Sequence, residues 1–244
     1  MSDKVLNHAI WAIVPAAGIG KRMQSAIPKQ YLSLNGRAVL EHTINALLLN
    51  KHISGLIIAL QKDDAHWSDI QLTSKKPVIR AEGGKERADS VLNALNALVE
   101  SDHFDETDWV MVHDAVRPCL TQSDINKLAA EVVSDSGGLL ALPVRDTMKR
   151  QGEDETVEQT IDRENLWHAL TPQYFSALGL RTALEHALTH GLTITDESSA
   201  MELAGYSPRL VQGQEDNIKI TRQDDLRLAS LYLEAQSMAN KPTE

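Results

Sequence analysis

The sequence has a single cysteine, no run of Lys and Arg residues and no long apolar run, and each of these scarcities excludes a class of protein. One cysteine, Cys119, cannot form an internal disulfide framework and is typical of a reducing compartment. A net charge of -10 without a Lys/Arg run argues against a nucleic acid or a membrane surface as a partner. The N-terminus lacks the pattern of a signal peptide, and no apolar run reaches membrane length. We therefore expect a cytoplasmic protein.

The order of apolar patterns predicts an α/β fold in a single domain. The 244 residues are 42% apolar, which is enough for one full hydrophobic core. Short apolar runs typical of buried strands alternate with segments of helical spacing. The predicted strands are 11–15, 55–60, 77–80, 109–112, 137–142, 166–170, 209–211 and 217–220; the predicted helices are 39–48, 88–99, 125–132, 178–188, a short one ending near 203, and one from 221 onward. We expect residues 1–244 to form one mainly parallel, twisted sheet with helices on both faces.

Residues 143–165 do not fit this alternation. They are rich in charge and contain Gly152 followed by the alternating stretch Val157–Ile161. This pattern favours a two-stranded arm that protrudes from the domain, although a mobile acidic loop is the alternative. An isolated hairpin is marginal in water, so we expect the arm to pack on a second copy of the chain and form a homodimer.

The most informative stretch follows the first predicted strand. Small residues replace the apolar run at Ala16, Ala17, Gly18 and Gly20, which lets backbone N–H groups approach a polyanion. Three cations then follow closely, and they are Lys21, Arg22 and Lys29. This combination predicts a phosphate-binding loop rather than an ordinary strand-to-helix turn.

Neither of two well-known glycine-loop fingerprints is met. The dinucleotide pattern G-x-G-x-x-G fails because Met23 occupies the third glycine position. The P-loop pattern G-x-x-x-x-G-K-[ST] fails because Arg22 follows Lys21 in place of a hydroxyl residue. The loop therefore disfavours a dehydrogenase and a P-loop enzyme.

Cations also gather after the other predicted strands, where parallel sheets bind their ligands. These loops contain Gly83, Gly84 and Arg87, then Asp114 and Arg117, then Arg145 and Lys149, and finally Asp216 and Lys219. An acidic chain that places cations there is expected to bind polyanionic substrates.

The sequence offers no ordinary nucleophile. Cys119 has no activating neighbour, and Ser198 and Ser199 follow two acidic residues at an expected helix start. Direct transfer between two bound substrates is then the simplest chemistry, because a phosphate monoester is already an anion at neutral pH. Mg²⁺ and cations would reduce its repulsion from a triphosphate. Asp114 and Asp216 are possible metal ligands, although a strand-end aspartate that caps a turn is equally consistent with the spacing.

Seven blocks, in order from about residue 13 to residue 233, resemble one family. They are Val14-Pro-Ala-Ala-Gly-Ile-Gly-Lys-Arg-Met23 with Pro28-Lys-Gln-Tyr31, Gly83-Gly-x-x-Arg-x-x-Ser-Val91, Val112-His-Asp-Ala-Val-Arg-Pro118, Pro143-Val-Arg-Asp-Thr-Met-Lys149, Leu166-Trp-His-Ala-Leu-Thr-Pro-Gln173, Thr195-Asp-Glu197 and Asp216-Asn-Ile-Lys219. The chain is thereby similar to the bacterial 2-C-methyl-D-erythritol 4-phosphate cytidylyltransferase family of the non-mevalonate isoprenoid pathway. The resemblance implies a Rossmann-like nucleotidyltransferase fold, a homodimer joined by the arm, and Mg²⁺-dependent transfer from CTP to methylerythritol phosphate.

The same resemblance implies roles for individual residues. Arg22 and Lys29 would stabilise the transition state at the α-phosphate, while Lys219 and the partner subunit's Arg163 would position the methylerythritol phosphate. The implied nucleotide-binding residues are Pro15, Ala16, Ala17, Gly18, Gly84, Lys85 and Ser90, and the implied substrate-binding residues are Asp114, Arg117, Thr147 and Thr195. Lys85 departs from the family pattern, in which an acidic or small residue often follows the glycine, and a backbone contact there would be unaffected.

Two alternative functions keep part of this pattern. A sugar-1-phosphate nucleotidyltransferase would share the first loop but not the arm with Thr147 and Arg163. A nucleotide-sensing dimer without turnover could dispense with Arg22, Lys29 or Lys219. All three cations are present, which favours catalysis.

Overall fold

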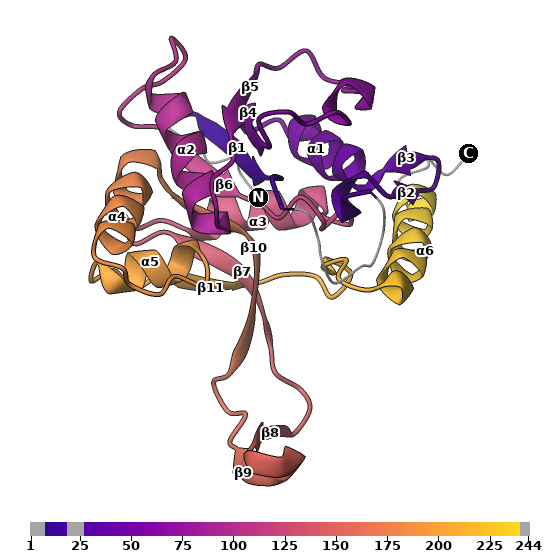
Figure 1. Cartoon of the computed structure of the whole chain (residues 1–244), viewed down its shortest axis with the longest axis vertical. Coiled ribbons are helices and arrows are strands. Elements are labelled where there is room, and N and C mark those ends of the chain that lie inside the picture. The colour runs from indigo at the N-terminus through magenta and orange to yellow at the C-terminus, as the bar shows by residue number, and fades with distance from the viewer. Residues whose placement is uncertain (1–7, 19–26, 240–244) are drawn as a thin grey trace.

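A computed structural model describes residues 8–18 and 27–239 and confirms the α/β fold. Its centre is a seven-stranded sheet in the order β11-β7-β10-β6-β1-β4-β5 (Figure 1). The strands are β1 (Ile10–Pro15), β4 (Ile53–Leu60), β5 (Val78–Glu82), β6 (Trp109–Val112), β7 (Gly138–Pro143), β10 (Trp167–Ser176) and β11 (Arg209–Gln212). Only β10 among them runs antiparallel to its neighbours, so the sheet is mainly parallel, as predicted.

Helices cover both faces of this sheet. They are α1 (Val39–Leu49), α2 (Arg87–Val99), α3 (Gln122–Glu131), α4 (Ala177–Thr189), α5 (Glu197–Leu203) and α6 (Gln223–Ala239). The short strands β2 (Ser33–Leu34) and β3 (Arg37–Ala38) pair beside α6, and a 3-10 turn, η2, spans Lys29–Tyr31.

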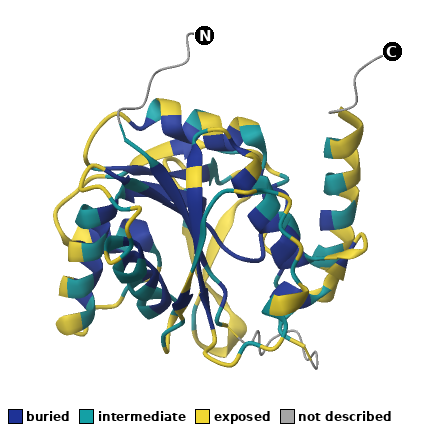
Figure 2. Cartoon of the chain, turned by 90° about the horizontal axis from the view of Figure 1, so that it is seen from above, coloured by how far each residue is buried: buried dark blue, intermediate teal, exposed yellow. Residues whose placement is uncertain are grey.

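The alternation of side chains along β1 explains the two layers. Ala12 and Val14 pack in the apolar core that contains α1 and α3, whereas Trp11 and Ile13 pack in the core that contains α2, α4 and α5. Successive residues of a strand point to opposite faces, so one apolar strand supplies both cores. A third cluster holds α6 against the body through residues that include Val116 and Ala229. Figure 2 shows the buried sheet between helices whose outer faces are exposed.

Two predicted strands differ from the structure. The stretch 166–170 belongs to the longer strand β10, whose pairing with β7 is interrupted between Ala169 and Gln173. Pro172 lies in this interruption and has no N–H group for the ladder. The stretch 217–220 is not a strand, because it crosses the loop after β6, where Ile220 N donates to Val116 O, rather than joining the sheet.

The arm is present as a two-stranded antiparallel hairpin that extends away from the sheet (Figure 1). Its strands are β8 (Met148–Gln151) and β9 (Val157–Ile161). All residues of β8 are exposed, and Val157 of β9 is 63% exposed. The hairpin therefore has no core of its own within the chain.

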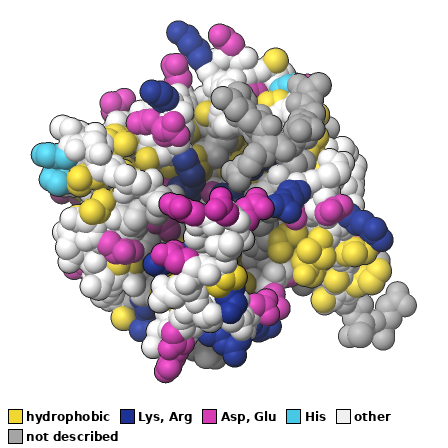
Figure 3. Space-filling model, turned by 60° about the horizontal axis from the view of Figure 1, so that its bottom comes forward, with side chains coloured by type: hydrophobic (Ala, Val, Ile, Leu, Met, Phe, Trp, Pro, Cys, Tyr) yellow, Lys and Arg dark blue, Asp and Glu magenta, His cyan; other side chains and the backbone are white. Residues whose placement is uncertain are grey.

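The surface mixes charges of both signs. Figure 3, in which the bottom of the molecule comes forward, shows acidic and basic side chains interspersed rather than one basic patch. Within residues 8–18 and 27–239, no helix combines the length and apolar character needed to cross a membrane.

Candidate active site

A pocket lies where β1 and β5 end, and we call it the glycine-loop pocket. It is lined by Pro15, Ala16, Ala17, Gly18, Lys29, Gln30, Gly84, Lys85, Glu86, Arg87, Ser90, Asp114, Ala115, Val116 and Lys219. The structure thus brings together all seven nucleotide-binding residues implied by the resemblance. Arg22 lies outside the described residues.

Backbone hydrogen bonds shape the first wall of this pocket. Ala16 N donates to Ala59 O of β4, and the Gln30 amide donates to Ala16 O at 2.7 Å and to Gly18 O at 3.1 Å. Gln30 is buried, so the 3-10 turn that contains Lys29 is fixed to the loop. Sequence analysis missed Gln30, although it stands beside Lys29.

The second wall is the turn that opens α2. A Cβ atom at Gly83 would collide with Ala17 Cβ, so only glycine allows the two loops to approach this closely. Gly84 N donates to Ser90 Oγ at 3.0 Å, and Glu86 and Asp89 form a reciprocal capping box at the start of α2. Ser90 therefore positions the glycine turn.

A second pocket adjoins the first, and we call it the adjacent pocket. It is lined by Arg87, Asp114, Arg117, Ala169, Leu170, Thr171, Gln173, Thr195, Asp196 and Lys219. Arg87, Asp114 and Lys219 line both pockets. These three residues form the shared wall between two potential ligands.

Asp114 is the centre of this shared wall. Its Oδ1 accepts from Arg87 Nε at 3.1 Å, and its Oδ2 lies 3.2 Å from Arg117 Nε and 3.0 Å from Lys219 Nζ. Burial opposes the charge of Asp114, but the charges of Arg87, Lys219 and Arg117 outweigh it and hold the pKa of the carboxyl well below its usual range. Asp114 therefore stays ionised and holds three cations in one place.

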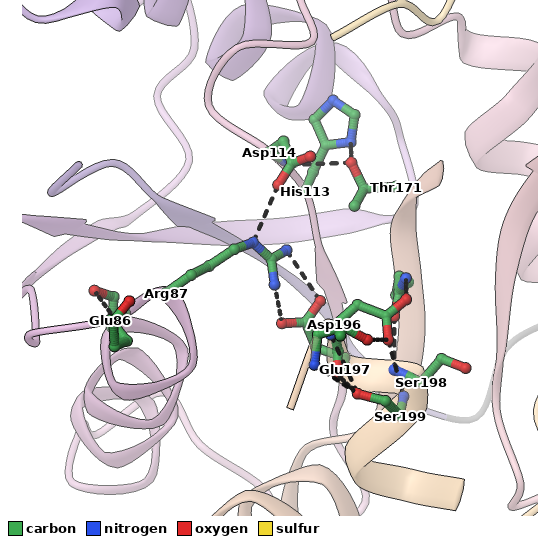
Figure 4. Close-up of polar contacts among 12 residues, drawn as sticks. Glu86, Arg87, His113, Asp114, Thr171, Asp196, Glu197, Ser198 and Ser199 are labelled. Carbon is green, nitrogen blue, oxygen red and sulfur yellow. Dashed lines mark hydrogen bonds and ion pairs between the residues drawn. The ribbon is translucent and has the colours of Figure 1, made fainter. Parts of the chain in front are cut away.

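A buried hydrogen-bond chain fixes the loop that presents Asp114. Asp114 N donates to Thr171 Oγ1 at 3.1 Å, and Thr171 Oγ1 lies 3.0 Å from His113 Nδ1 (Figure 4). His113 Nε2 lies 3.1 Å from Arg117 O, which can only accept. The neutral ring therefore carries its hydrogen on Nε2, and Nδ1 accepts from Thr171. The interruption in β10 brings Thr171 into this chain.

The burial of His113 makes stability depend on pH. Burial lowers the pKa of His113 to about 4 from its ordinary 6.5, so the unfolded chain binds more protons between these values. The contribution of the neutral His113 to the free energy of unfolding is complete above pH 6.5 and is lost as the pH falls toward 4. This contribution amounts to about 3 kcal/mol at most. We expect His113→Gln to lose this part of the pH dependence in denaturant unfolding measured from pH 7 to pH 4.

Two comparisons control this measurement. Burial raises the pKa of Asp124 to about 6, so this carboxyl makes stability fall rather than rise with pH over part of the range. The effect of Asp124 is the same in variant and wild type, so it cancels when their profiles are subtracted. His168→Gln, on an exposed part of β10, should keep the wild-type profile. An unchanged profile in His113→Gln would contradict the neutral, buried imidazole.

Three predicted site residues lie outside both pockets of the chain. Thr147 and Arg163 are exposed at the base of the hairpin, just before β8 and just after β9, where Arg163 Nη1 donates to Arg145 O. Asp216 accepts from Gln236 of α6 at 2.6 Å and lines neither pocket. The structure thus separates Asp216 from Asp114 as a possible metal ligand.

The carboxylates near the pockets limit how a magnesium ion could bind. Among residues 8–18 and 27–239, no three His, Cys, Asp or Glu side chains converge as a metal site. Asp114 Oδ1 accepts from Arg87 and retains a second lone pair. Magnesium in phosphate-binding sites is commonly held by one or two carboxylates, with substrate phosphates and water as its other ligands. The single carboxylate of Asp114 therefore fits a magnesium ion that arrives with a triphosphate.

Cys119 and the two serines have structural roles, as predicted. Cys119 is completely buried, and burial raises the pKa of its thiol to about 12. Ser198 N donates to Gln173 Oε1, and Ser199 completes a capping box with Asp196 at the start of α5. None of the three is placed to act as a nucleophile.

Comparisons with known proteins identify the family of the chain. Residues 10–235 match the family model of 2-C-methyl-D-erythritol 4-phosphate cytidylyltransferase. The protein of that name from Aliivibrio fischeri is 52% identical over 234 residues, which cover 96% of this chain and 97% of that protein. A crystal structure of 4-diphosphocytidyl-2C-methyl-D-erythritol synthase matches with a TM-score of 0.81 and 33% identity over 93% of this chain and all of that one. The Francisella tularensis cytidylyltransferase structure gives a TM-score of 0.78 and 34% identity over 92% and 99% of the two chains. The chain therefore belongs to the 2-C-methyl-D-erythritol 4-phosphate cytidylyltransferase family.

Proposed function

We propose that the protein transfers a cytidylyl group from CTP to 2-C-methyl-D-erythritol 4-phosphate and releases pyrophosphate. The observation that carries this proposal is the shared wall of Arg87, Asp114 and Lys219, which separates a glycine-lined pocket from a second cationic pocket. Two anionic substrates in these pockets would meet at a cluster of positive charge. Membership of the family identifies the two substrates.

CTP would occupy the glycine-loop pocket. The small side chains of Ala16, Ala17 and Gly18 leave room for a ligand to lie against the backbone, and Lys29 lines the same wall. Methylerythritol phosphate would occupy the adjacent pocket, where Arg117, Thr195 and Lys219 can bind its phosphate and hydroxyl groups.

The transfer needs no protein nucleophile. An oxygen of the methylerythritol phosphate attacks the α-phosphorus of CTP, a new P–O bond forms, and the bond to the β-phosphate breaks so that pyrophosphate leaves with its electron pair. The attacking phosphate is already ionised, so no strong base is required. Lys29 and Lys219, with Arg22, would stabilise the negative charge that develops on the oxygens around the α-phosphorus.

Magnesium would assist by binding the triphosphate oxygens and reducing their charge. Asp114 is the residue of the shared wall that could contact the ion, directly or through water. The protein's own part is to orient the two substrates and to supply the cations.

We also propose that the arm joins two copies of the chain. Its strands are exposed on both faces, and Val157 is a large apolar side chain in contact with solvent in the single chain. Packing the arm on a partner would bury this surface and could bring the partner subunit's Arg163 toward the adjacent pocket. Thr147, at the same base of the hairpin, would enter the same interface.

We infer that the chain is one domain with this arm as its appendage, and that it works in the cytoplasm. The two main cores are the opposite faces of one sheet, which supports a single folding unit. The only cysteine is a buried free thiol, which suits a reducing compartment.

Pyrophosphate release measured with four nucleoside triphosphates against several acceptors tests the proposed function. We expect turnover with CTP and methylerythritol phosphate in the presence of magnesium, and much slower release with sugar 1-phosphates or other triphosphates. Preferred use of a sugar 1-phosphate would support the alternative nucleotidyltransferase. Nucleotide binding without release from any pair would indicate a sensing dimer.

A further inference from the structure

Glu197 is a buried carboxylate to which neither the sequence nor the proposed mechanism assigns a role. It is the first residue of α5 and is 1% exposed. Asp196 caps the helix through Ser199 N, so the cap does not use the Glu197 side chain. A buried glutamate needs a partner that compensates its lost hydration.

That partner is Arg87, the first residue of α2. Its Nη1 donates to Glu197 Oε1 at 2.6 Å and its Nη2 donates to Oε2 at 3.1 Å, while its Nε faces Asp114 (Figure 4). Two parallel bonds of this kind fix the orientation of a guanidinium as well as its position. One arginine thus links the starts of two helices to the loop after β6.

The pair of hydrogen bonds from Arg87 to Glu197, which we call the fork, determines which cations each carboxylate oxygen of Asp114 contacts. With both Nη atoms held by Glu197, Arg87 reaches only Oδ1 of Asp114, and Oδ2 is left for Arg117 and Lys219. Without the charge of Glu197, the Nη donors of Arg87 would turn to Asp114, the other carboxylate within reach. They would then compete with Lys219 for Oδ2.

We propose that Glu197 is a positioning residue for the transfer reaction, because it aims Arg87 and thereby keeps Lys219 in place between the two pockets. This inference rests on the proposed function. Lys219 lines both pockets, but Arg117, which shares Oδ2 of Asp114 with it, lines only the adjacent pocket, so the phosphate-monoester substrate is affected more strongly than the nucleotide. Glu197 itself contacts neither substrate.

Steady-state kinetics of Glu197→Gln test this role. The amide keeps the size of the side chain but removes its charge and one acceptor. We expect kcat/KM for methylerythritol phosphate to fall about tenfold or more, with KM for CTP within about twofold of wild type. A glutamate that only stabilises the fold would not separate the two substrates in this way.

A double-mutant cycle with Arg87→Ala tests the route of the effect. If Glu197 acts through Arg87, adding Glu197→Gln to Arg87→Ala should lower kcat/KM no further, within about twofold. A full additional loss in that background would overturn the proposal. Wild-type kinetics of Glu197→Gln would overturn it as well.

Further variants keep the test decisive. Glu202→Gln, on the same helix, removes a carboxylate that accepts from Ser198 and should keep wild-type kinetics. Arg87→Lys keeps the charge but cannot form the fork, so it should lose about as much activity as Glu197→Gln, and wild-type activity there would overturn the proposal even if Glu197→Gln does not fold. Absence of pyrophosphate release by the wild type would instead refute the proposed function.

Discussion

Replacing Lys29 with alanine is expected to lower kcat by about a hundredfold or more while the fold remains intact. The reason is that a cation directed at developing charge stabilises the transition state by several kcal/mol. Lys29 lines the glycine-loop pocket, and its Nζ donates to Ile220 O at 3.3 Å. That bond places Lys29 beside the segment that carries Lys219. Lys29 should therefore contribute to the stabilisation of the charge that develops in the transition state rather than to substrate binding.

Rates measured at saturating CTP and methylerythritol phosphate, together with KM for each, distinguish these possibilities. A loss confined to the transition state lowers kcat and kcat/KM in parallel. Lys127→Ala is a matched control, because Lys127 also donates to a backbone carbonyl, Gln212 O, but is half-buried on α3 away from both pockets. A Lys29→Ala enzyme with nearly wild-type kcat would remove Lys29 from the catalytic residues.

The glycine loops and the sheet could be predicted because their signals are local. The apolar run of β1 is followed directly by small residues, so both can be read from one short stretch of sequence. Gly83 and Ala17, which approach each other closely, each lie in a glycine-containing turn that the sequence reveals. Charged side chains in the loops after parallel strands are expected to lie near one another, since those strands end at one edge of the sheet. Lys29, Asp114 and Lys219 accordingly line one pocket.

The fork between Arg87 and Glu197 could not be predicted in this way. Its two residues are 110 positions apart and meet only because the sheet order places the starts of α2 and α5 on either side of β6. In the sequence, Glu197 is an ordinary acidic residue in the first turn of a helix, which the helix dipole alone explains. Thr171 was missed for a related reason, because its contact with His113 depends on an interruption in β10.

The arm raises a different difficulty, since the partner proposed for it is a second copy of the chain. The sequence predicts a hairpin from Gly152 and the alternation of β9, and the structure contains it. The exposed surfaces of that hairpin favour a partner that covers them, but the proposal that this partner is a second copy of the chain rests on the family resemblance. Whether Arg163 completes a site must therefore be tested in an assembly of two chains.

Mixing two impaired variants should restore activity if Arg163 serves the partner's site. In a heterodimer of Lys29→Ala and Arg163→Ala chains, one site has both defects, whereas the other combines an intact Lys29 with an intact Arg163 of the partner subunit. Half of the dimers in an equal, fully exchanged mixture are heterodimers, so about a quarter of the wild-type activity should return, given the two-fold symmetry of a dimer. Arg163→Ala alone should mainly raise KM for methylerythritol phosphate.

The same mixture also tests whether Arg163 acts in its own chain. If Arg163 acted in its own chain, each heterodimer would have two singly defective sites, and the mixture would show only the average of the two variants. Heterodimers can be purified with two different affinity tags, so that exchange is verified before the rates are compared. Lys127→Ala mixed with Arg163→Ala provides the reference, because the Lys127→Ala chain supplies an intact Arg163 and an intact Lys29. Purified heterodimers of Lys29→Ala and Arg163→Ala without recovered activity would show that the arm does not complete the neighbouring site, and Lys219 and Arg117 would then have to position the methylerythritol phosphate within one chain.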